Sequence, residues 1–119
     1  MHIILDATQV ELYSEKYTVL ELDTFRIVDG PSDVTAYCVV ESIPITEMNQ
    51  IDSFRNLHNN LMSNYRKKDW NYCEQAIDHL VGKWNGELDS FYIDLLQRIN
   101  KFKEQDPGDM WDGVLLKSA

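Results

Sequence analysis

Apolar residues recur every three or four positions through the second half of the chain, which is the spacing of one face of an α-helix. Three such stripes follow one another, and each predicts a helix. The first stripe consists of Met48, Ile51, Phe54, Leu57, Leu61, Met62 and Tyr65. The second consists of Trp70, Cys73, Ile77, Leu80, Val81 and Trp84. The third consists of Leu88, Tyr92, Leu95, Ile99 and Phe102.

Polar residues and glycines mark where these helices begin and end. Thr46 and Asp69 suit the N-caps of the first two helices, because their side-chain oxygens can accept a backbone N–H from the first turn. Gly82 and then Asn85-Gly86 supply stop signals, and Asp106-Pro107-Gly108 ends the third helix. The links between the stripes are short, so we expect neighbouring helices to run antiparallel.

Residues 1–45 are richer in β-branched and aromatic residues, which favour strands. Strand candidates are His2–Asp6, Tyr17–Ile27 and Val34–Ile43. The turn-rich stretch 28–33 predicts that the last two form a hairpin. Their alternation is imperfect, which a β-bulge or burial on both faces would explain. For residues 7–16 a loop, a helical turn and an edge strand all remain open.

These elements predict an α+β fold. A small antiparallel β-hairpin or sheet in the N-terminal half packs beside a three-helix antiparallel array in the C-terminal half. At 119 residues we expect one domain, with a β-rich half at 1–45 and a helical half at 46–119. The tail at 106–119 is apolar, so Trp111 and Leu115 should pack back onto the helices.

The charge of the chain is strongly negative and unevenly placed. The formal net charge is −9, and nine acidic against two basic residues give residues 1–50 most of it. A nucleic-acid-binding protein needs a cationic face, and an anionic membrane surface attracts cations. We therefore expect neither direct nucleic-acid binding nor membrane association. No apolar run reaches the ~20 residues that span a bilayer.

The two cysteines, Cys38 and Cys73, lie in unrelated segments and have no metal-binding spacing. We expect buried, reduced thiols in a cytoplasmic protein. The N-terminus lacks the basic region and the long apolar run of a secretory signal.

Residues on facing sides of the predicted helices should form a dry structural seam. Its members are Trp70, Cys73, Ile77, Leu80, Tyr92, Leu95, Arg98 and Ile99. Within it, the run from Tyr65 through Trp70 to Cys73 and Ile77 resembles the crossing of a tetratricopeptide (TPR) helix pair, in which a small residue lets two helices approach closely. Here Cys73 replaces the usual Ala, and Ile77 replaces the usual Phe.

The later part of the chain extends this resemblance. The residues that carry it are Asp89, Tyr92, Arg98, Phe102, Asp106-Pro107 and Trp111-Asp112-Gly113-Val114. Over residues 61–114 the chain resembles the TPR-like C-terminal tail of class III adenylate cyclases. The resemblance implies a helical tail and no cyclase activity, because nothing here matches the separate catalytic domain. The chain is also similar to small uncharacterised proteins of marine bacteriophages, which implies host cytoplasm or virion as its location.

Several side chains could carry chemistry. Glu21 and Asp23, with Asp6, could hold Mg²⁺ in a nuclease-like site, although exposed acids on a solvated sheet face explain them too. His58 and His79 could meet and bind a metal with Asp78 or Glu74, but histidines of such helices are more often ordinary packed or surface residues.

Other side chains suit contacts with a partner. Arg66, Lys67 and Lys68 could bind phosphate or an acidic partner, or simply complement the helix dipole. Trp111, followed by Asp112 and Gly113, is the candidate for a partner-facing aromatic. No nucleophile, phosphate-binding or dinucleotide motif occurs, so we assign no catalytic residue, no metal site and no cofactor.

Three hypotheses for function follow. The leading one is a non-catalytic interaction module that docks another protein or itself. The second is an acidic decoy or inhibitor of a nucleic-acid enzyme, whose acidic face would include Glu21, Asp23, Asp29 and Asp33. It requires these acids and Asp6, Glu11, Glu15, Glu41 and Glu47 to form one contiguous surface. The third is a metal-dependent hydrolase.

Overall fold

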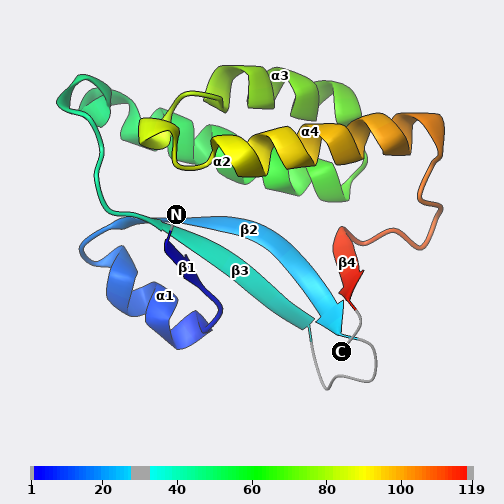
Figure 1. The fold of residues 1–119 in the computed structure, drawn as a ribbon, viewed down its shortest axis with the longest axis horizontal. Coiled ribbons are helices and arrows are strands. Elements are labelled where there is room, and N and C mark those ends of the chain that lie inside the picture. The colour runs from blue at the N-terminus through cyan, green and yellow to red at the C-terminus, as the bar shows by residue number, and fades with distance from the viewer. Residues whose placement is uncertain (1, 28–32, 118–119) are drawn as a thin grey trace. The chain divides into compact units, whose positions relative to one another are not determined.

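The computed structural model describes the chain except residues 1, 28–32 and 118–119. It is α+β, as predicted, and divides into two compact units (Figure 1). The sheet unit comprises residues 1–41 and 112–119, and the helical unit comprises residues 42–111. In sequence, the helical unit is therefore inserted between two parts of the sheet unit.

The sheet unit contains one four-stranded sheet in the order β1-β3-β2-β4. Strands β2 (Thr18–Ile27) and β3 (Asp33–Val40) form the predicted antiparallel hairpin, and β1 (His2–Ile4) pairs antiparallel with β3. The hairpin turn lies outside the described residues except for Asp33. Strand β4 (Val114–Lys117) pairs with β2 in parallel, so the sheet is mixed.

Strand β4 gives the tail a regular structure that the sequence did not predict. Leu115, which was expected to pack on the helices, is paired with Phe25 of β2 in the sheet unit. The reason is that its backbone N–H and C=O groups find partners at the free edge of β2, which a packed but irregular tail would leave unsatisfied. Trp111 does pack on the helices, as described below.

The imperfect alternation of β2 has both of the causes that the sequence suggested. The register between β2 and β3 shifts between Glu21 and Thr24, which marks a bulge or irregularity. The sheet also has buried side chains on both faces. Leu20 pairs with Cys38 and Val39 with Val19, so Cys38 and Val39 point to opposite faces, yet both are fully buried.

Residues 7–14 are helical, which resolves the segment left open by the sequence. Helix α1 (Ala7–Ser14) starts at Asp6, whose carboxylate accepts the backbone N–H of Thr8 at 2.9 Å. Its Tyr13 ring contacts the rings of His2 and Tyr17. No residue of α1 is buried, so α1 lacks the apolar stripe that would have predicted it.

The helical unit contains α2 (Ile51–Arg66), α3 (Trp70–Leu80) and α4 (Asp89–Glu104) with two 3₁₀ turns, η1 (Ile45–Gln50) and η2 (Trp84–Gly86). Thr46 is not the N-cap that the sequence predicted. The turn η1 follows Pro44 and is closed by the backbone, because the N–H of Glu47 donates to the carbonyl of Pro44. Trp84 belongs to η2 and not to α3, because Gly82 has a φ of 87° and ends the helix.

Neighbouring helices run antiparallel. Tyr65 near the end of α2 contacts the ring of Trp70 at the start of α3, with 5.9 Å between the ring centroids. Trp70 in turn stacks on Phe102 near the end of α4 at 5.5 Å. After α3, the N–H of Gly82 donates to Asp89 at the start of α4 at 2.8 Å.

The link between α2 and α3 is fixed by caps at both helix ends. Lys68 has a φ of 63°, and its N–H donates to the carbonyl of Tyr65. The N–H of Asp69 donates to the carbonyl of Asn64, so this is a Schellman motif with lysine at the left-handed position. The side chain of Asp69 accepts the N–H of Tyr72 and caps α3, as the sequence predicted.

Candidate functional site

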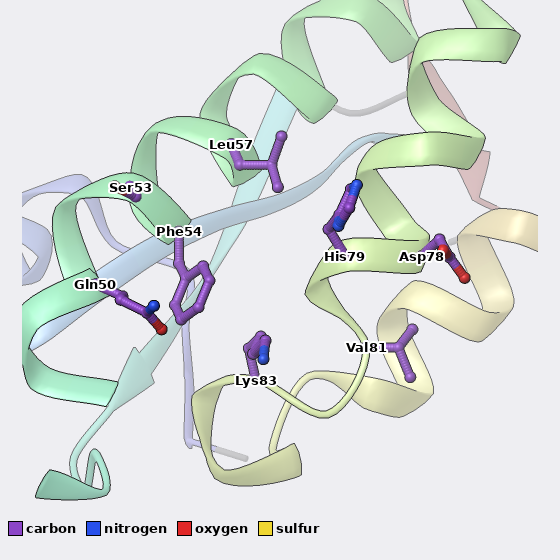
Figure 2. Close-up of a pocket in the computed structure, with 8 residues that line it drawn as sticks. All are labelled: Gln50, Ser53, Phe54, Leu57, Asp78, His79, Val81 and Lys83. Carbon is purple, nitrogen blue, oxygen red and sulfur yellow. The ribbon is translucent and has the colours of Figure 1, made fainter. Parts of the chain in front are cut away.

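An open groove of about 540 Å³ lies between α2 and α3 (Figure 2). Phe54 and Leu57 of α2 and Val81 after α3 supply its apolar surface. All three belong to the apolar stripes that predicted the first two helices. None of them is buried, because Phe54 and Leu57 are half-buried and Val81 is exposed. The other lining residues are Gln50, Ser53, Asp78, His79 and Lys83.

We call this hollow the α2/α3 groove. Other side chains pack against its apolar floor and hold it in place. The Phe54 ring lies edge-on to the buried indole of Trp84, with 6.1 Å between centroids. The Nζ of Lys83 lies 5.3 Å from the centroid of the Phe54 ring, a cation–π contact. A floor that is already packed loses little conformational entropy when a ligand binds.

The rim of the α2/α3 groove is polar and carries both signs of charge. Ser53, Asp78 and His79 are exposed. Neither Asp78 nor His79 makes a hydrogen bond or ion pair with other residues described by the structure. Their donor and acceptor groups therefore remain available to a ligand. An apolar floor with a few polar groups around it is the composition of a typical recognition site.

A second open hollow, of about 630 Å³, lies on the other side of α3, against α4. Ile77, Val81 and Leu96 line it together with the polar residues Glu74, Gln75, Asp78 and Asn100. Glu74 is paired with Lys103 at 2.8 Å. Asp78 and Val81 line both hollows, so the exposed ridge of α3 separates the two.

The two histidines do not meet. His58 is fully buried, with Nδ1 2.9 Å from the hydroxyl of Tyr92, whereas His79 is exposed in the α2/α3 groove. Among the residues described, no group of three or more His, Cys, Asp or Glu side chains is arranged to hold a metal ion. Glu21, Asp23 and Asp6 therefore do not form such a group either. Asp6 is occupied as the cap of α1.

The predicted seam residues lie in the interior or at its edge. Cys73, Ile77, Leu80, Tyr92, Leu95 and Ile99 are buried. Trp70 is half-buried, and Arg98 donates to the hydroxyl of Tyr65 at 3.2 Å. The Cys73 Sγ lies 3.7 Å from the carbonyl oxygen of Leu61, so α2 and α3 approach closely here.

Cys73 is unsuited to act as a nucleophile. Burial, with the nearby charges of Asp69 and Glu74, raises the pKa of its thiol to about 12. The thiolate is the reactive form of cysteine, and it is scarce at neutral pH when the pKa is so high. Cys38, in the sheet unit, is also a buried free thiol.

Trp111, the predicted partner-facing aromatic, instead joins a cluster of rings. Its ring lies 4.8 Å from Phe102 and 5.4 Å from Tyr65, and its indole N–H donates to the carbonyl of Tyr65 at 3.3 Å. It remains half-exposed. Because its N–H and its ring already contact residues of α2 and α4, Trp111 helps to hold the end of the helical unit together.

Asp112 and Gly113 have structural roles in the sheet unit. Asp112 accepts the N–H of Val114 at 3.0 Å and pairs with Arg26 of β2 at 3.0 Å, and both interactions lower the pKa of its carboxyl. Gly113 has a φ of 81°, which favours glycine at this position. The two residues thus turn the chain into β4.

The three cations at the C-terminal end of α2 have different roles. Arg66 lies in the last turn, and Lys67 is the exposed C-cap. Lys68 pairs with Asp106 at 2.9 Å. Because Lys68 is engaged in the fold, the three do not form a free cationic patch.

The candidate acidic face is also divided. Asp23 is buried, and Glu21 is half-buried. Asp33 is paired with Arg26 at 3.0 Å, and Asp29 lies outside the described residues. Glu41 makes a 2.8 Å contact with His2. Among the described carboxylates named here, Asp23 is therefore buried, and Asp33 and Glu41 already have partners.

Comparison with protein-family models, with curated proteins and with solved structures finds no significant match to the chain. No helix among the described residues has the length and apolar character needed to cross a membrane.

Proposed function

We propose that this protein is a non-catalytic interaction module whose helical unit binds a partner protein in the α2/α3 groove. The observation that carries the proposal is the groove itself. It combines a supported apolar floor at Phe54 and Leu57 with the unengaged polar group of His79 beside it (Figure 2). Pairs of antiparallel helices commonly use such grooves to bind segments of other proteins.

The partner segment should be short and of mixed character. A groove of about 540 Å³ is large enough for a few side chains and too small for a folded domain. We expect one apolar anchor against Phe54 and Val81, flanked by polar groups that bond to Ser53 or His79. An anchor in a preformed pocket contributes most of the affinity in such interfaces.

We also propose that α2 and α3 form a TPR-like helix pair, and the close approach of the two helices at Cys73 and Leu61 supports this. The location that fits it is a reducing compartment such as the cytoplasm, because Cys38 and Cys73 are both free. The decoy and hydrolase hypotheses receive no such support, since the acids are divided and no metal cluster forms among the described residues.

The test is affinity capture with a variant that fills the groove. Ser53→Arg places a long side chain over the floor, and Asn59→Arg makes the same change at an exposed α2 position outside the groove. Proteins captured from a lysate of the source cells by the wild-type chain are identified by mass spectrometry. The leading partner is then purified, and its Kd is measured by calorimetry with all three proteins.

We expect Ser53→Arg to weaken binding by at least tenfold, and Asn59→Arg to leave Kd within twofold of the wild-type value. Equal binding by all three proteins, or capture of no protein that binds the purified chain, would contradict the proposal. Circular dichroism of both variants checks that the helices remain folded.

A further inference from the structure

The hollow between α3 and α4 differs in character from the α2/α3 groove. Its apolar residues are Ile77, Val81 and Leu96, and Val81 is 40% exposed. Ile93 is 48% exposed and lies three residues before Leu96, so the two share a face of α4 and lengthen the apolar strip. An exposed apolar strip with a polar edge marks an interaction site.

Among the residues that the structure describes, the charged ones lining this hollow are acidic. Glu74 is neutralised by Lys103, which leaves Asp78 as the carboxylate without a partner among the described residues. The other polar lining groups are the amides of Gln75 and Asn100. A ligand that complements this hollow therefore needs an apolar face and a cation beside it.

The length of the hollow suits a helix. Its α3 side runs from Glu74 to Val81, a separation of seven positions or about 10 Å at the rise of an α-helix. A partner helix with apolar residues at i, i+4 and i+7 repeats over the same distance. A third helix laid along two antiparallel ones buries its apolar face by ordinary helix packing.

We infer that the α3/α4 hollow binds an amphipathic helix of a partner protein, with a lysine or arginine of that helix facing Asp78. This adds a second surface to the proposed function and does not require the α2/α3 groove to be occupied. A second copy of this chain is a poorer occupant, because both copies are acidic, with a net charge of −9 each.

Two synthetic peptides of about 15 residues serve as the probes. Both carry leucines at i, i+4, i+7 and i+11, and they differ only in that one has lysines and the other glutamates beside the leucines. Binding to the full chain is followed by fluorescence anisotropy and by backbone NMR shifts. We expect the lysine peptide to bind about tenfold more tightly and to shift residues of α3 and α4 around Val81 and Leu96.

Four variants locate the binding. Asp78→Asn should weaken the lysine peptide about three- to fivefold, while Asp94→Asn, a control on another face of α4, should not. Asn100→Arg places a cation at the exposed rim of the hollow. Repulsion from the lysines of the peptide should weaken peptide binding more than Asp78→Asn does. Ser53→Arg should leave it unchanged. None of these positions is buried, so folding should be preserved.

Each other outcome overturns the inference. Failure of both peptides to bind, equal binding of the two, or equal effects of Asp78→Asn and Asp94→Asn would each exclude a charge-selective site here. If Ser53→Arg abolishes peptide binding, the peptide occupies the α2/α3 groove. That result would reject the second site while supporting the first.

Discussion

A single hydroxyl, that of Tyr92, links three segments of the helical unit. The indole N–H of Trp84 donates to it at 3.1 Å, and the Nδ1 of His58 lies 2.9 Å from it. All three side chains are buried. A buried polar group costs free energy unless it is bonded, so this hydroxyl stabilises α2, η2 and α4 against one another by satisfying two polar neighbours at once.

We therefore predict that Tyr92→Phe lowers the free energy of unfolding by about 1–3 kcal/mol, because the Trp84 N–H loses its partner in the interior. Urea denaturation followed by circular dichroism measures the change. Tyr72→Phe is the matched control, since the Tyr72 hydroxyl makes no hydrogen bond among the residues described. A Tyr92→Phe protein as stable as the control would show that the network contributes nothing to stability.

At the scale of elements, the sequence predicts the helical unit well. The stripes around α2, α3 and α4 extend over 11 or more residues each, and local capping at Asp69 reinforces the boundary. The stripes and caps come from residues of the helix itself and do not depend on distant parts of the chain. The hairpin of β2 and β3 is predicted for the same reason, since its two strands are neighbours in sequence.

The elements that the sequence did not predict lack a local signal. Helix α1 buries no residue, so it has no stripe. Strand β4 has only four residues, and its partner Thr24–Ile27 lies about 90 positions away. The α2/α3 groove was missed because Phe54, Leu57 and Val81 look the same in sequence whether they fill a core or floor a groove. Their unpaired polar neighbours Asp78 and His79 become informative only in three dimensions.

Asp112 gives β4 a testable link to pH. Its carboxyl has a pKa below the usual value of 3.8, because the Val114 N–H and Arg26 bond to the charged form. Its contribution to stability is therefore fully present above pH 3.8 and is lost as the pH falls below that value. We predict that Asp112→Asn loses less stability than the wild-type protein between pH 6 and pH 2.

Urea unfolding at several pH values measures that difference. Asp94→Asn, which removes an exposed carboxylate with no ion pair among the described residues, serves as the control. If the stability of Asp112→Asn changed with pH as that of the wild-type protein does, the pair with Arg26 would not stabilise the sheet unit.

At the scale of the whole molecule, the last strand of the sheet lies far in sequence from the other three strands. The sheet unit uses both ends of the chain, and the helical unit occupies the sequence between β3 and β4. Along the chain, β4 therefore comes after the whole helical unit, and the four-stranded sheet is complete only when β4 has paired with β2. Pairing between distant segments costs more chain entropy than pairing between neighbours, so β4 should be the last strand to join.

This order makes β4 a cover for an edge that would otherwise remain open. Removing residues 112–119 exposes the hydrogen-bonding groups of Thr24–Ile27 in β2, and an unpaired strand edge is a template for association with other chains.

We predict that the shortened chain forms concentration-dependent oligomers in sizing chromatography with light scattering, whereas a chain lacking only residues 118–119 behaves as the full chain does. Leu115→Pro, which removes one strand N–H without shortening the chain, should act in the same direction. If both altered proteins match the full chain in size and in unfolding midpoint at every concentration, β4 is not what protects the edge of β2.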